Sequence, residues 1–379
     1  MSEKNISTLE GAAMIAGTGI GSGVMAIPYL FHHSGIIGGI IALGSAYVIS
    51  MLLHFFVADI MLNTRTNEIA TAISGLIITG KRKKIIRYIL LSFVVIMIIA
   101  NLCSYILGGA EILTSVFNIN SFPAKIIFCI SAIIPTLFGL KVIGNGEKYL
   151  IGIISGLVIY FFVISVCHPA GSISLAGRFS FVIETFSMTM FSMTAIFAVP
   201  QLVSGLNYDK KKIKTSIIGG LSLNLAVCVL ICISTIAASR NVTKMAAVGW
   251  SESFGSTFKI LSGIFILLAM LTSFFVLAYS LASIISKWFK IKPALCFTIS
   301  TLPSLLMSFI PFASFTKVTK LASGIISLLI AILIIPSYYK SVKMTNASPI
   351  IGRYRRHYII YIATLAGIIL MTIGSLIEV

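Results

Sequence analysis

The sequence predicts an all-α polytopic membrane protein with about eleven transmembrane helices, and three observations carry this prediction. Of the 379 residues, 58% are hydrophobic and only 10% are charged, against about 25% charged residues in soluble domains. The apolar residues occur in long runs, and a spanning helix needs about 20 of them. Short gaps with charged residues or turn signals separate the runs. A soluble globular protein is therefore excluded, and residues 1–379 are expected to form one integral membrane domain.

The apolar runs follow one another with connections too short for a separate soluble domain. Each run is read as one transmembrane helix because it is long and nearly free of charge. The predicted spans cover residues 10–30, 35–61, 86–114, 122–140, 148–168, 181–206, 214–237, 257–286, 293–312, 317–339 and 357–377.

The basic residues predict the orientation of the chain. The formal net charge is +18, but the lysines and arginines lie in the gaps between spans, which argues against nucleic acid binding. With the N-terminus in the cytoplasm, 21 of the 28 fall on the cytoplasmic side, as the positive-inside rule requires. The other seven are Lys125, Arg178, Arg240, Lys244, Lys259, Lys317 and Lys320. We therefore expect a multi-pass protein of the inner (cytoplasmic) membrane with a cytoplasmic N-terminus and an outer C-terminus.

Two connections are longer than a turn. Residues 64–80 predict a short amphipathic helix on the inner surface, because apolar side chains recur there at helical spacing. These side chains are Ile69, Ile73, Leu76 and Ile77. Residues 239–255 form an outer loop. This loop either caps a vestibule or is an ordinary linker whose Trp250 lies at the membrane interface.

The first span is predicted to be interrupted. It contains IAGTGIGSGVMAIPYL, with glycine at positions 17, 19, 21 and 23 and proline at 28. Each glycine weakens a helix by about 1 kcal/mol relative to alanine, and unwound chain is tolerated in lipid only where it is buried or lines a cavity. The alternative is close helix packing through G-x-x-x-G pairs. If the break exists, the amides of Gly21, Ser22 and Gly23 start a half-helix whose positive end suits a carboxylate.

The sixth span carries a weaker signal of the same kind. Four hydroxyl residues precede Pro200, and proline removes one backbone N–H while hydroxyls can satisfy local backbone groups; they are Ser187, Thr189, Ser192 and Thr194. Unwinding near Phe191 to Ala195 would free carbonyls for an ammonium group. A continuous, merely kinked helix is the alternative.

The two interrupted spans are five spans apart and cross the membrane in opposite directions. This relationship is typical of an inverted-repeat transporter with its binding site at the midplane. It predicts one repeat over about residues 10–168, a second over about 181–339, and an extra helix over about 357–377.

Polar groups within the spans are few. Five acidic residues fall near predicted span ends, where solvation at the interface is expected; they are Glu10, Asp59, Glu111, Glu147 and Glu184. In the eighth span, Thr272 and Ser273 place two hydroxyls near mid-membrane. Together with carbonyl oxygens of an unwound neighbour they could form a cage for a monovalent cation. The alternative is that both hydroxyls bond to carbonyls of their own helix.

The stretch IAGTGIGSGVMAIPYL resembles the first-helix signature of the bacterial aromatic and hydroxy amino acid permeases, which belong to the amino acid–polyamine–organocation superfamily. The resemblance implies a LeuT-type fold with five plus five inverted helices and eleven spans. It implies that Gly21, Ser22 and Gly23 receive the substrate carboxylate and that the unwound part of the sixth span contacts the amine and side chain. The pattern Ala-x-x-Thr-Ser also resembles a sodium site, which implies ligands at Gly17, Ile20, Ala269, Thr272 and Ser273.

Two departures from the family pattern bear on substrate and ion. Before Pro200 the sequence reads MTAIFAVP, where the aromatic permeases tend to carry glycine and histidine. The family is usually proton-coupled, yet the Thr272 and Ser273 pair and the lack of a mid-span lysine in the fifth span favour sodium. Sodium is therefore the expected coupling ion, and a proton is the alternative.

The predicted function is secondary active import of amino acids, of the tryptophan and tyrosine type, driven by a cation gradient through alternating access. The pocket walls are expected to combine aromatic, thioether and hydrogen-bonding groups; they are Asn101, Tyr105, Phe191, Ser192, Met193 and Thr194. The alternative is a proton-coupled or exchanging permease for serine, threonine or an amine. We find no catalytic constellation and expect no enzyme activity and no cofactor besides the coupling ion. The expected partners are the amino acid substrate and the membrane lipid, with no obligate protein partner.

Overall fold

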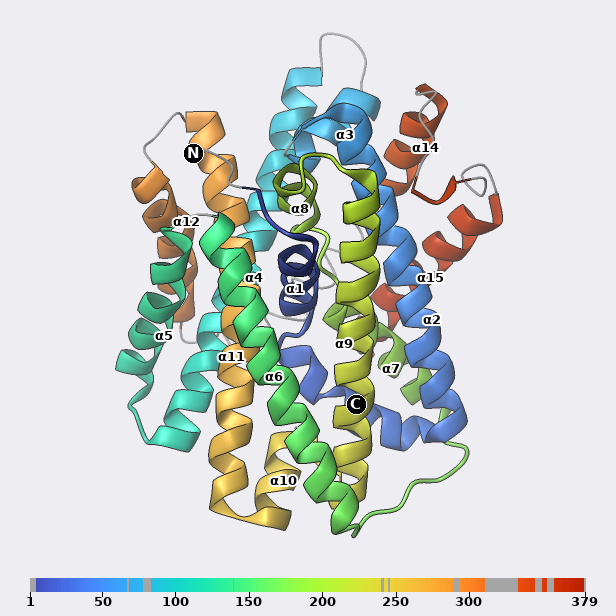
Figure 1. Ribbon diagram of the computed structural model, residues 1–379, viewed down its shortest axis with the longest axis vertical. Coiled ribbons are helices and arrows are strands. Elements are labelled where there is room, and N and C mark those ends of the chain that lie inside the picture. Colours follow the sequence, from blue (N-terminus) through green and yellow to red (C-terminus); the bar gives the residue numbers. More distant parts are fainter. Residues whose placement is uncertain are drawn as a thin grey trace.

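The computed structural model describes residues 5–66, 68–77, 83–138, 140–239, 242–244, 246–289, 293–310, 333–344, 350–352 and 358–377, which contain helices and no strand. Six of the described helices are long and apolar enough to cross a membrane (Figure 1). They lie within α2 (Ile27–Thr64), α4 (Lys83–Phe117), α6 (Leu140–Cys167), α9 (Lys210–Ala238), α11 (Ser256–Phe289) and α15 (Tyr358–Leu376). The prediction of an all-helical polytopic protein is confirmed.

The remaining described elements are shorter. They are α1 (Thr8–Gly19), η1 (Ser22–Met25), α3 (Ile69–Ile77), α5 (Ser121–Thr136), α7 (Phe179–Ser192), α8 (Val199–Gly205), α10 (Ala246–Phe254), α12 (Pro293–Ser308) and α14 (Ile335–Met344). Of the expected span 317–339, residues 317–332 lie outside the described part of the chain, and α14 begins at its end.

The first expected span is broken, as the glycine pattern predicts. Helix α1 begins with a capping box, in which Ser7 accepts from the N–H of Glu10 and Glu10 accepts from the N–H of Ser7, and it ends at Gly19. A 3₁₀ turn, η1, follows and leads into α2. Gly35 has φ +72° within α2, a conformation that suits glycine. A Cβ there would lie 2.6 Å from the backbone of Ala176, so α2 contains the outer half of the first span, a kink, and the second span.

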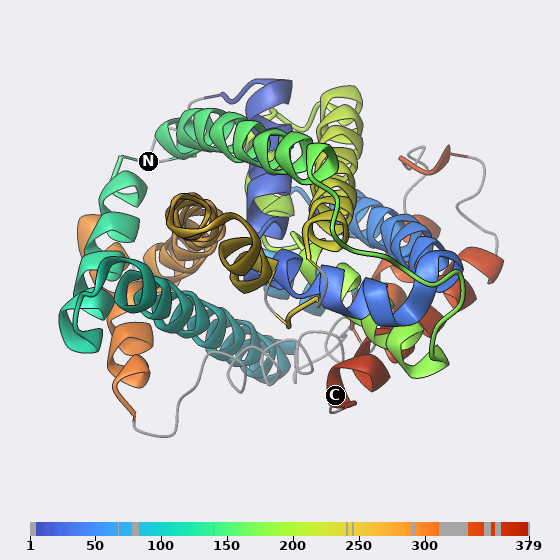
Figure 2. The same cartoon turned by 90° about the horizontal axis from the view of Figure 1, so that it is seen from below.

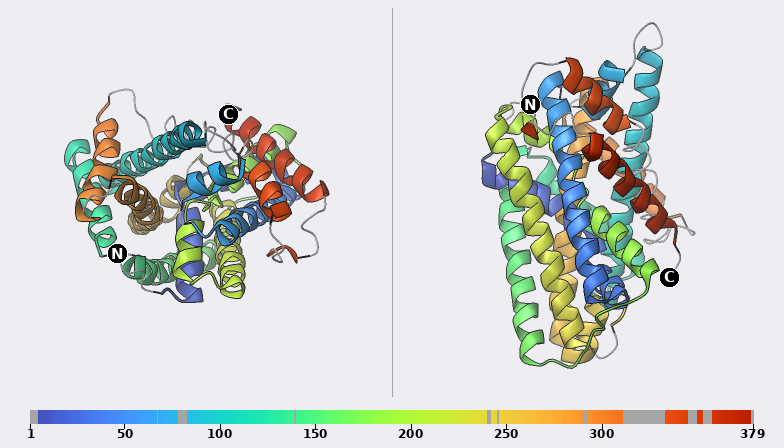
Figure 3. Two further views of the ribbon diagram at one scale, coloured as in Figure 1. Left: turned by 90° about the horizontal axis from the view of Figure 1, so that it is seen from above. Right: turned by 90° about the vertical axis from the view of Figure 1, so that its right-hand side faces the viewer.

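Helix α1 lies at the centre of the molecule. It packs against α6, α9 and α11, and the ribbon views show it surrounded by these longer helices (Figures 1 and 2). The outer helix faces carry exposed apolar side chains such as Ile37, Ile40 and Ile41 of α2, which suits contact with lipid. Helix α15 runs beside α2 and α7 (Figure 3). The broken segments are therefore held inside a shell of continuous helices.

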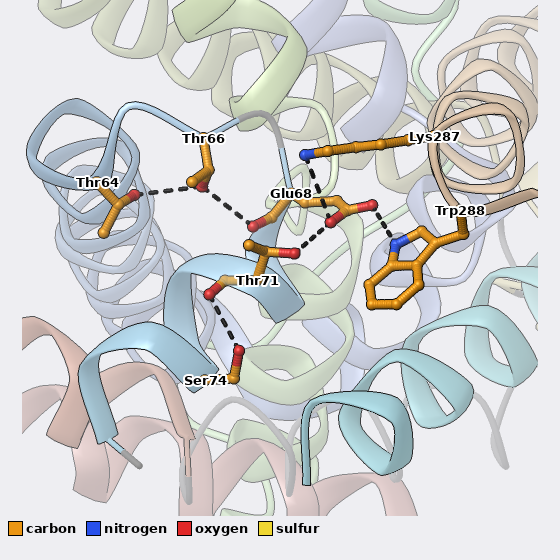
Figure 4. A network of polar contacts seen from close by, with 7 residues as sticks. All are labelled: Thr64, Thr66, Glu68, Thr71, Ser74, Lys287 and Trp288. Carbon is orange, nitrogen blue, oxygen red and sulfur yellow. Dashed lines mark hydrogen bonds and ion pairs between the residues drawn. The ribbon is translucent and has the colours of Figure 1, made fainter. Parts of the chain in front are cut away.

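The expected amphipathic helix in residues 64–80 exists as α3, at one end of the molecule (Figure 1). It packs on α4, α14 and α2. Figure 4 shows the polar network that precedes it. Glu68 accepts from Trp288 Nε1 at 2.6 Å, from Thr71 Oγ1, and pairs with Lys287 at 3.7 Å. This network connects the start of α3 to the end of α11.

The expected outer loop, residues 239–255, contains α10 at the opposite end of the molecule (Figure 1). Trp250 is fully buried, and its ring centroid lies 4.5 Å from that of Phe161. The alternative of a linker with an interfacial tryptophan is therefore wrong. Residues of α10, among them Glu252, help to line a cavity of about 580 Å³ together with Ile164, His168 and Ser239. That the loop caps a vestibule leading to the central cavity stays a prediction.

Candidate substrate and cation sites

The sixth expected span is also broken. Helix α7 ends at Ser192 and α8 begins at Val199, so residues 193–198 are not helical. Unwinding was expected over residues 191–195, which starts two residues earlier and ends three residues earlier than the observed segment. Pro200 lies in the first turn of α8, where its missing N–H costs no helical hydrogen bond. The kinked continuous helix is therefore wrong, and proline starts the second half-helix.

His54 holds this non-helical segment in place. Its Nε2 lies 3.1 Å from the backbone nitrogen of Ala195, and its Nδ1 lies 2.7 Å from the carbonyl oxygen of Ser50. Because Ala195 N–H can only donate, Nε2 accepts and Nδ1 carries the proton that it donates to Ser50. The imidazole is fully buried, whereas the sequence places His54 near a span end. Its partner is a backbone atom some 140 residues away, which no local pattern indicates.

The two breaks lie against each other. Asn224 on α9 donates from Nδ2 to the carbonyl of Ser192 at 2.9 Å, and Ser192 Oγ donates to the carbonyl of Gly19 at 3.4 Å. A Cβ on Gly19 would lie 2.3 Å from Asn224 Nδ2 and 2.7 Å from the Ser192 carbonyl oxygen. Glycine at position 19 therefore permits the end of α1 to approach the end of α7. Asn224 has no signal in the sequence beyond being a polar residue within an apolar run.

A cavity lies between the two breaks. Seven of the nine expected substrate residues line it, namely Gly21, Gly23, Asn101, Tyr105, Phe191, Ser192 and Thr194. Thr18, Gly19, Phe197 and Leu277 also line it and were not expected. Of the remaining two, Met193 is fully buried beside the cavity rather than on its wall, and Ser22 starts η1. The structure therefore brings the residues of three expected spans to one place.

The walls of this cavity differ from one side to the other. A Cβ on Gly21 would lie 3.4 Å from Ser273 Oγ and 3.5 Å from Tyr105 OH, whereas a Cβ on Gly23 would lie 3.2 Å from the ring of Phe191. One side thus offers hydroxyls and the first amides of η1, which lack helical partners. The other side offers an aromatic ring. The cavity is therefore polar on one side and aromatic on the other.

The free volume of the cavity is small. It measures about 30 Å³, close to the share of one water molecule in the liquid, whereas pockets for small ligands run to roughly 300–1,000 Å³. An amino acid can therefore enter only after the walls move. Phe191 and Thr194 are the lining residues at the unwound segment that are only half-buried.

The hydroxyls of the eighth expected span contact α1. Thr272 Oγ1 lies 3.1 Å from the carbonyl oxygen of Gly17, and Ser273 Oγ lies 3.0 Å from the same atom and 3.1 Å from that of Thr18. Both also lie 2.9–3.2 Å from the carbonyl of Ala269 in their own helix. Both hydroxyls therefore contact carbonyls of α1, as the cation cage requires, and also bond to a carbonyl of their own helix. Four of the five expected sodium ligands gather, with the carbonyl of Thr18 rather than Ile20 as the second α1 oxygen in contact.

Glu147 lies beside this oxygen cluster. A Cβ on Gly17 would lie 2.0 Å from Glu147 Oε2 and 3.2 Å from Thr272 Cβ. The residue was expected at the interface, at the end of a span beginning at 148, but α6 begins at Leu140 and Glu147 is 0% exposed.

The expectation of solvation at the interface is also wrong for Glu10 and Asp59, which are both buried. Glu10 pairs with Lys141 at 2.7 Å, and Asp59 accepts from the N–H of Ile350 at 2.9 Å. Glu184 is also buried, at 7% exposed, and Glu111 alone of the five is exposed.

Comparison with known protein families gives a match over nearly the whole chain. A sequence model of the tryptophan/tyrosine permease family matches residues 4–374. No curated protein matches the chain.

Several solved transporters have a similar fold. Mhp1, described as a nucleobase-cation-symport-1 family transporter with bromovinylhydantoin bound, has a TM-score of 0.71 at 13% identity, over 99% of this chain and 91% of that one. MhsT in complex with L-phenylalanine has a TM-score of 0.70 at 15% identity, over 99% and 100%. A manganese transporter of Eremococcus coleocola has a TM-score of 0.66 at 14% identity, over 97% and 85%. These likenesses establish the LeuT-type transporter fold.

Proposed function

This chain belongs to the tryptophan/tyrosine permease family, and from that premise we propose that it imports aromatic amino acids across the inner membrane. Membership in a permease family and the transporter fold identify an amino acid transporter rather than an enzyme. The aromatic substrate, the direction and the coupling ion are our proposal. Transport proceeds by alternating access around the breaks between α1 and η1 and between α7 and α8.

The cavity between the two breaks is the single observation that carries the proposal. The start of η1 at Ser22 follows an extended residue, Gly21, and its first amides and positive dipole end favour a carboxylate. Phe191 and the cavity side of Gly23 lie in contact distance, where an aromatic side chain gains from ring contacts. The likeness to MhsT, whose structure contains L-phenylalanine, supports the same substrate class.

Coupling to sodium is the second part of the proposal. The cluster of Gly17, Ala269, Thr272 and Ser273 offers oxygen ligands only, which suits a hard cation. Because the cluster joins α1 to α11, a bound cation favours the arrangement in which these helices are in contact. A proton is the alternative coupling ion, and a permease for serine, threonine or an amine is the alternative function.

The cytoplasmic end of α1 is the part that we expect to move. Glu10 of α1 pairs with Lys141 of α6 at 2.7 Å, and Lys141 is about one-third exposed. Because the Glu10 side chain is buried while Lys141 reaches solvent, the pair can open only if the Glu10 carboxylate also gains access to water, which requires a movement of α1. Release of this pair would allow α1 to swing away from α6 and deliver the substrate to the cytoplasm.

Uptake by proteoliposomes tests the proposal. A panel of labelled amino acids is supplied while a sodium gradient and a pH gradient are imposed separately. We expect tryptophan, tyrosine or phenylalanine to accumulate under an inward sodium gradient. Accumulation of serine or threonine alone would contradict the aromatic substrate. Accumulation under the pH gradient alone would show that the coupling ion is a proton.

A further inference from the structure

Glu147 is a buried acidic side chain without a hydrogen-bond partner in the described part of the protein. Both carboxylate oxygens are inaccessible and unpaired, and the side chain is 0% exposed. Burying a charged carboxylate without a partner is very costly, and buried charges in proteins are normally paired or coordinate a metal ion. The carboxylate therefore needs either a proton or a positively charged partner.

The basic residues on the same helix do not supply this partner. Lys141 uses its ammonium group to pair with both carboxylate oxygens of Glu10 at 2.7 Å. Lys148 lies over the ring of Tyr149, 4.8 Å from its centroid, and residues adjacent on a helix point in different directions. The carboxylate lies instead against α1 at Gly17, whose carbonyl belongs to the oxygen cluster between α1 and α11.

The contact with α1 explains why residue 17 is glycine. A methyl group there would overlap Glu147 Oε2 at 2.0 Å, and Thr272 Cβ lies 3.2 Å from the same point. The carbonyl of Gly17 in turn accepts from Thr272 and Ser273. The carboxylate of α6 and the two hydroxyls of α11 thus lie against the same residue of α1, Gly17.

We propose that Glu147 is the charged ligand of the coupling-cation site, so that the site binds a monovalent metal ion with one carboxylate and several neutral oxygens. This inference rests on the proposed cation-coupled transport and names a ligand that the resemblance to a sodium site does not include. A single negative charge neutralises a single positive one, and the pair costs less to bury than either alone. The cation would also draw α6 onto α1 and α11, so that three helices respond to its binding.

Sodium binding to the purified protein tests the proposal without transport. Equilibrium binding of radioactive sodium is compared between the unmodified protein, Glu147→Gln and Glu111→Gln. Glu111→Gln removes the same charge from an exposed position of α4, and it should bind sodium like the unmodified protein. We expect Glu147→Gln to lower the affinity for sodium by at least about tenfold, because losing a group that supports a metal site costs about 10- to 100-fold.

The effect of sodium on the Tm distinguishes a ligand of the cation from a residue with a merely structural role. A neutral amide costs less to bury than an unpaired carboxylate, so Glu147→Gln should be at least as stable as the unmodified protein without sodium. Added sodium should raise the Tm of the unmodified protein and not that of Glu147→Gln. If Glu147→Gln cannot be purified, Gly17→Ala serves in its place, because its methyl group displaces the carboxylate while the charge remains in the chain.

Each result decides the proposal. Sodium affinity unchanged in Glu147→Gln, or no sodium binding by the unmodified protein, would overturn it. Sodium binding that depends on Glu147 in a protein that transports no amino acid would support the cation site and refute the proposed transport function.

Discussion

His54 accepts a hydrogen bond from the backbone N–H of Ala195 at 3.1 Å and thereby connects α2 to the non-helical segment between α7 and α8. Ala195 is fully buried, so its N–H has no access to water if the imidazole is lost. A buried donor left without an acceptor costs about 1–3 kcal/mol.

Replacement of His54 by leucine should therefore destabilise the protein by about 1–3 kcal/mol and weaken substrate binding. His54→Gln should retain more of both, because its amide oxygen can accept from Ala195. His168→Leu is the matched control, since His168 is exposed. Thermal unfolding and tryptophan affinity are measured for all three. Equal stability of His54→Leu and the unmodified protein would show that this hydrogen bond does not hold the segment.

Gly23 lies where a side chain would fill the substrate cavity. A Cβ there is 3.2 Å from the Phe191 ring and 3.4 Å from Met188 Sδ, so Gly23→Leu should lower tryptophan affinity by at least about tenfold, equivalent to about 1.4 kcal/mol. Gly44→Leu, in open space on the exposed face of α2, is the matched control and should bind normally. Normal transport by Gly23→Leu would exclude this cavity as the substrate site.

The hydroxyls of α11 should determine ion dependence. Thr272→Ala combined with Ser273→Ala removes both side-chain oxygens from the cluster, so amino acid uptake should no longer respond to sodium. The matched control is the double alanine substitution of Ser234 and Thr235, two adjacent residues of α9 whose hydroxyls bond to the carbonyls of Leu230 and Ile231 in their own helix. Uptake by this control should still respond to sodium. Sodium-independent uptake by the unmodified protein would reject the cage and favour proton coupling.

The orientation can be tested at the start of α9 and in the segment between α9 and α10. Cysteines are introduced at Lys211 and Lys244, both exposed, in a background without the six native cysteines. Because the positive-inside rule places Lys211 in the cytoplasm, an impermeant reagent on intact cells should label only position 244. Permeabilised cells, in which both should react, are the control. Labelling of both from one side would contradict the topology.

Much of the fold could be predicted from the sequence, because glycine, proline and apolar run length act locally. The break after Gly19 follows from four glycines in seven residues, and the break before Val199 follows from Pro200. The exact unwound residues could not be predicted, since the hydrogen bonds that fix them come from His54 and Asn224 on distant helices.

The residues of the cation cluster could also be predicted only in part. Thr272 and Ser273 could be selected because two adjacent hydroxyls stand out in an apolar run. Glu147 could not, because hydropathy locates the start of a span only to within a few residues, and α6 begins eight residues before the expected position 148. Those two helical turns change Glu147 from a solvated end residue into a buried one.

Competition for uptake tests most directly the central claim that the cavity between the two breaks accepts an aromatic amino acid. Labelled tryptophan is supplied to proteoliposomes under an inward sodium gradient, with each unlabelled amino acid in excess. Because Phe191 and Tyr105 line the cavity, we predict that unlabelled tryptophan, tyrosine or phenylalanine suppresses uptake far more strongly than serine or threonine. Stronger suppression by serine or threonine would contradict the account.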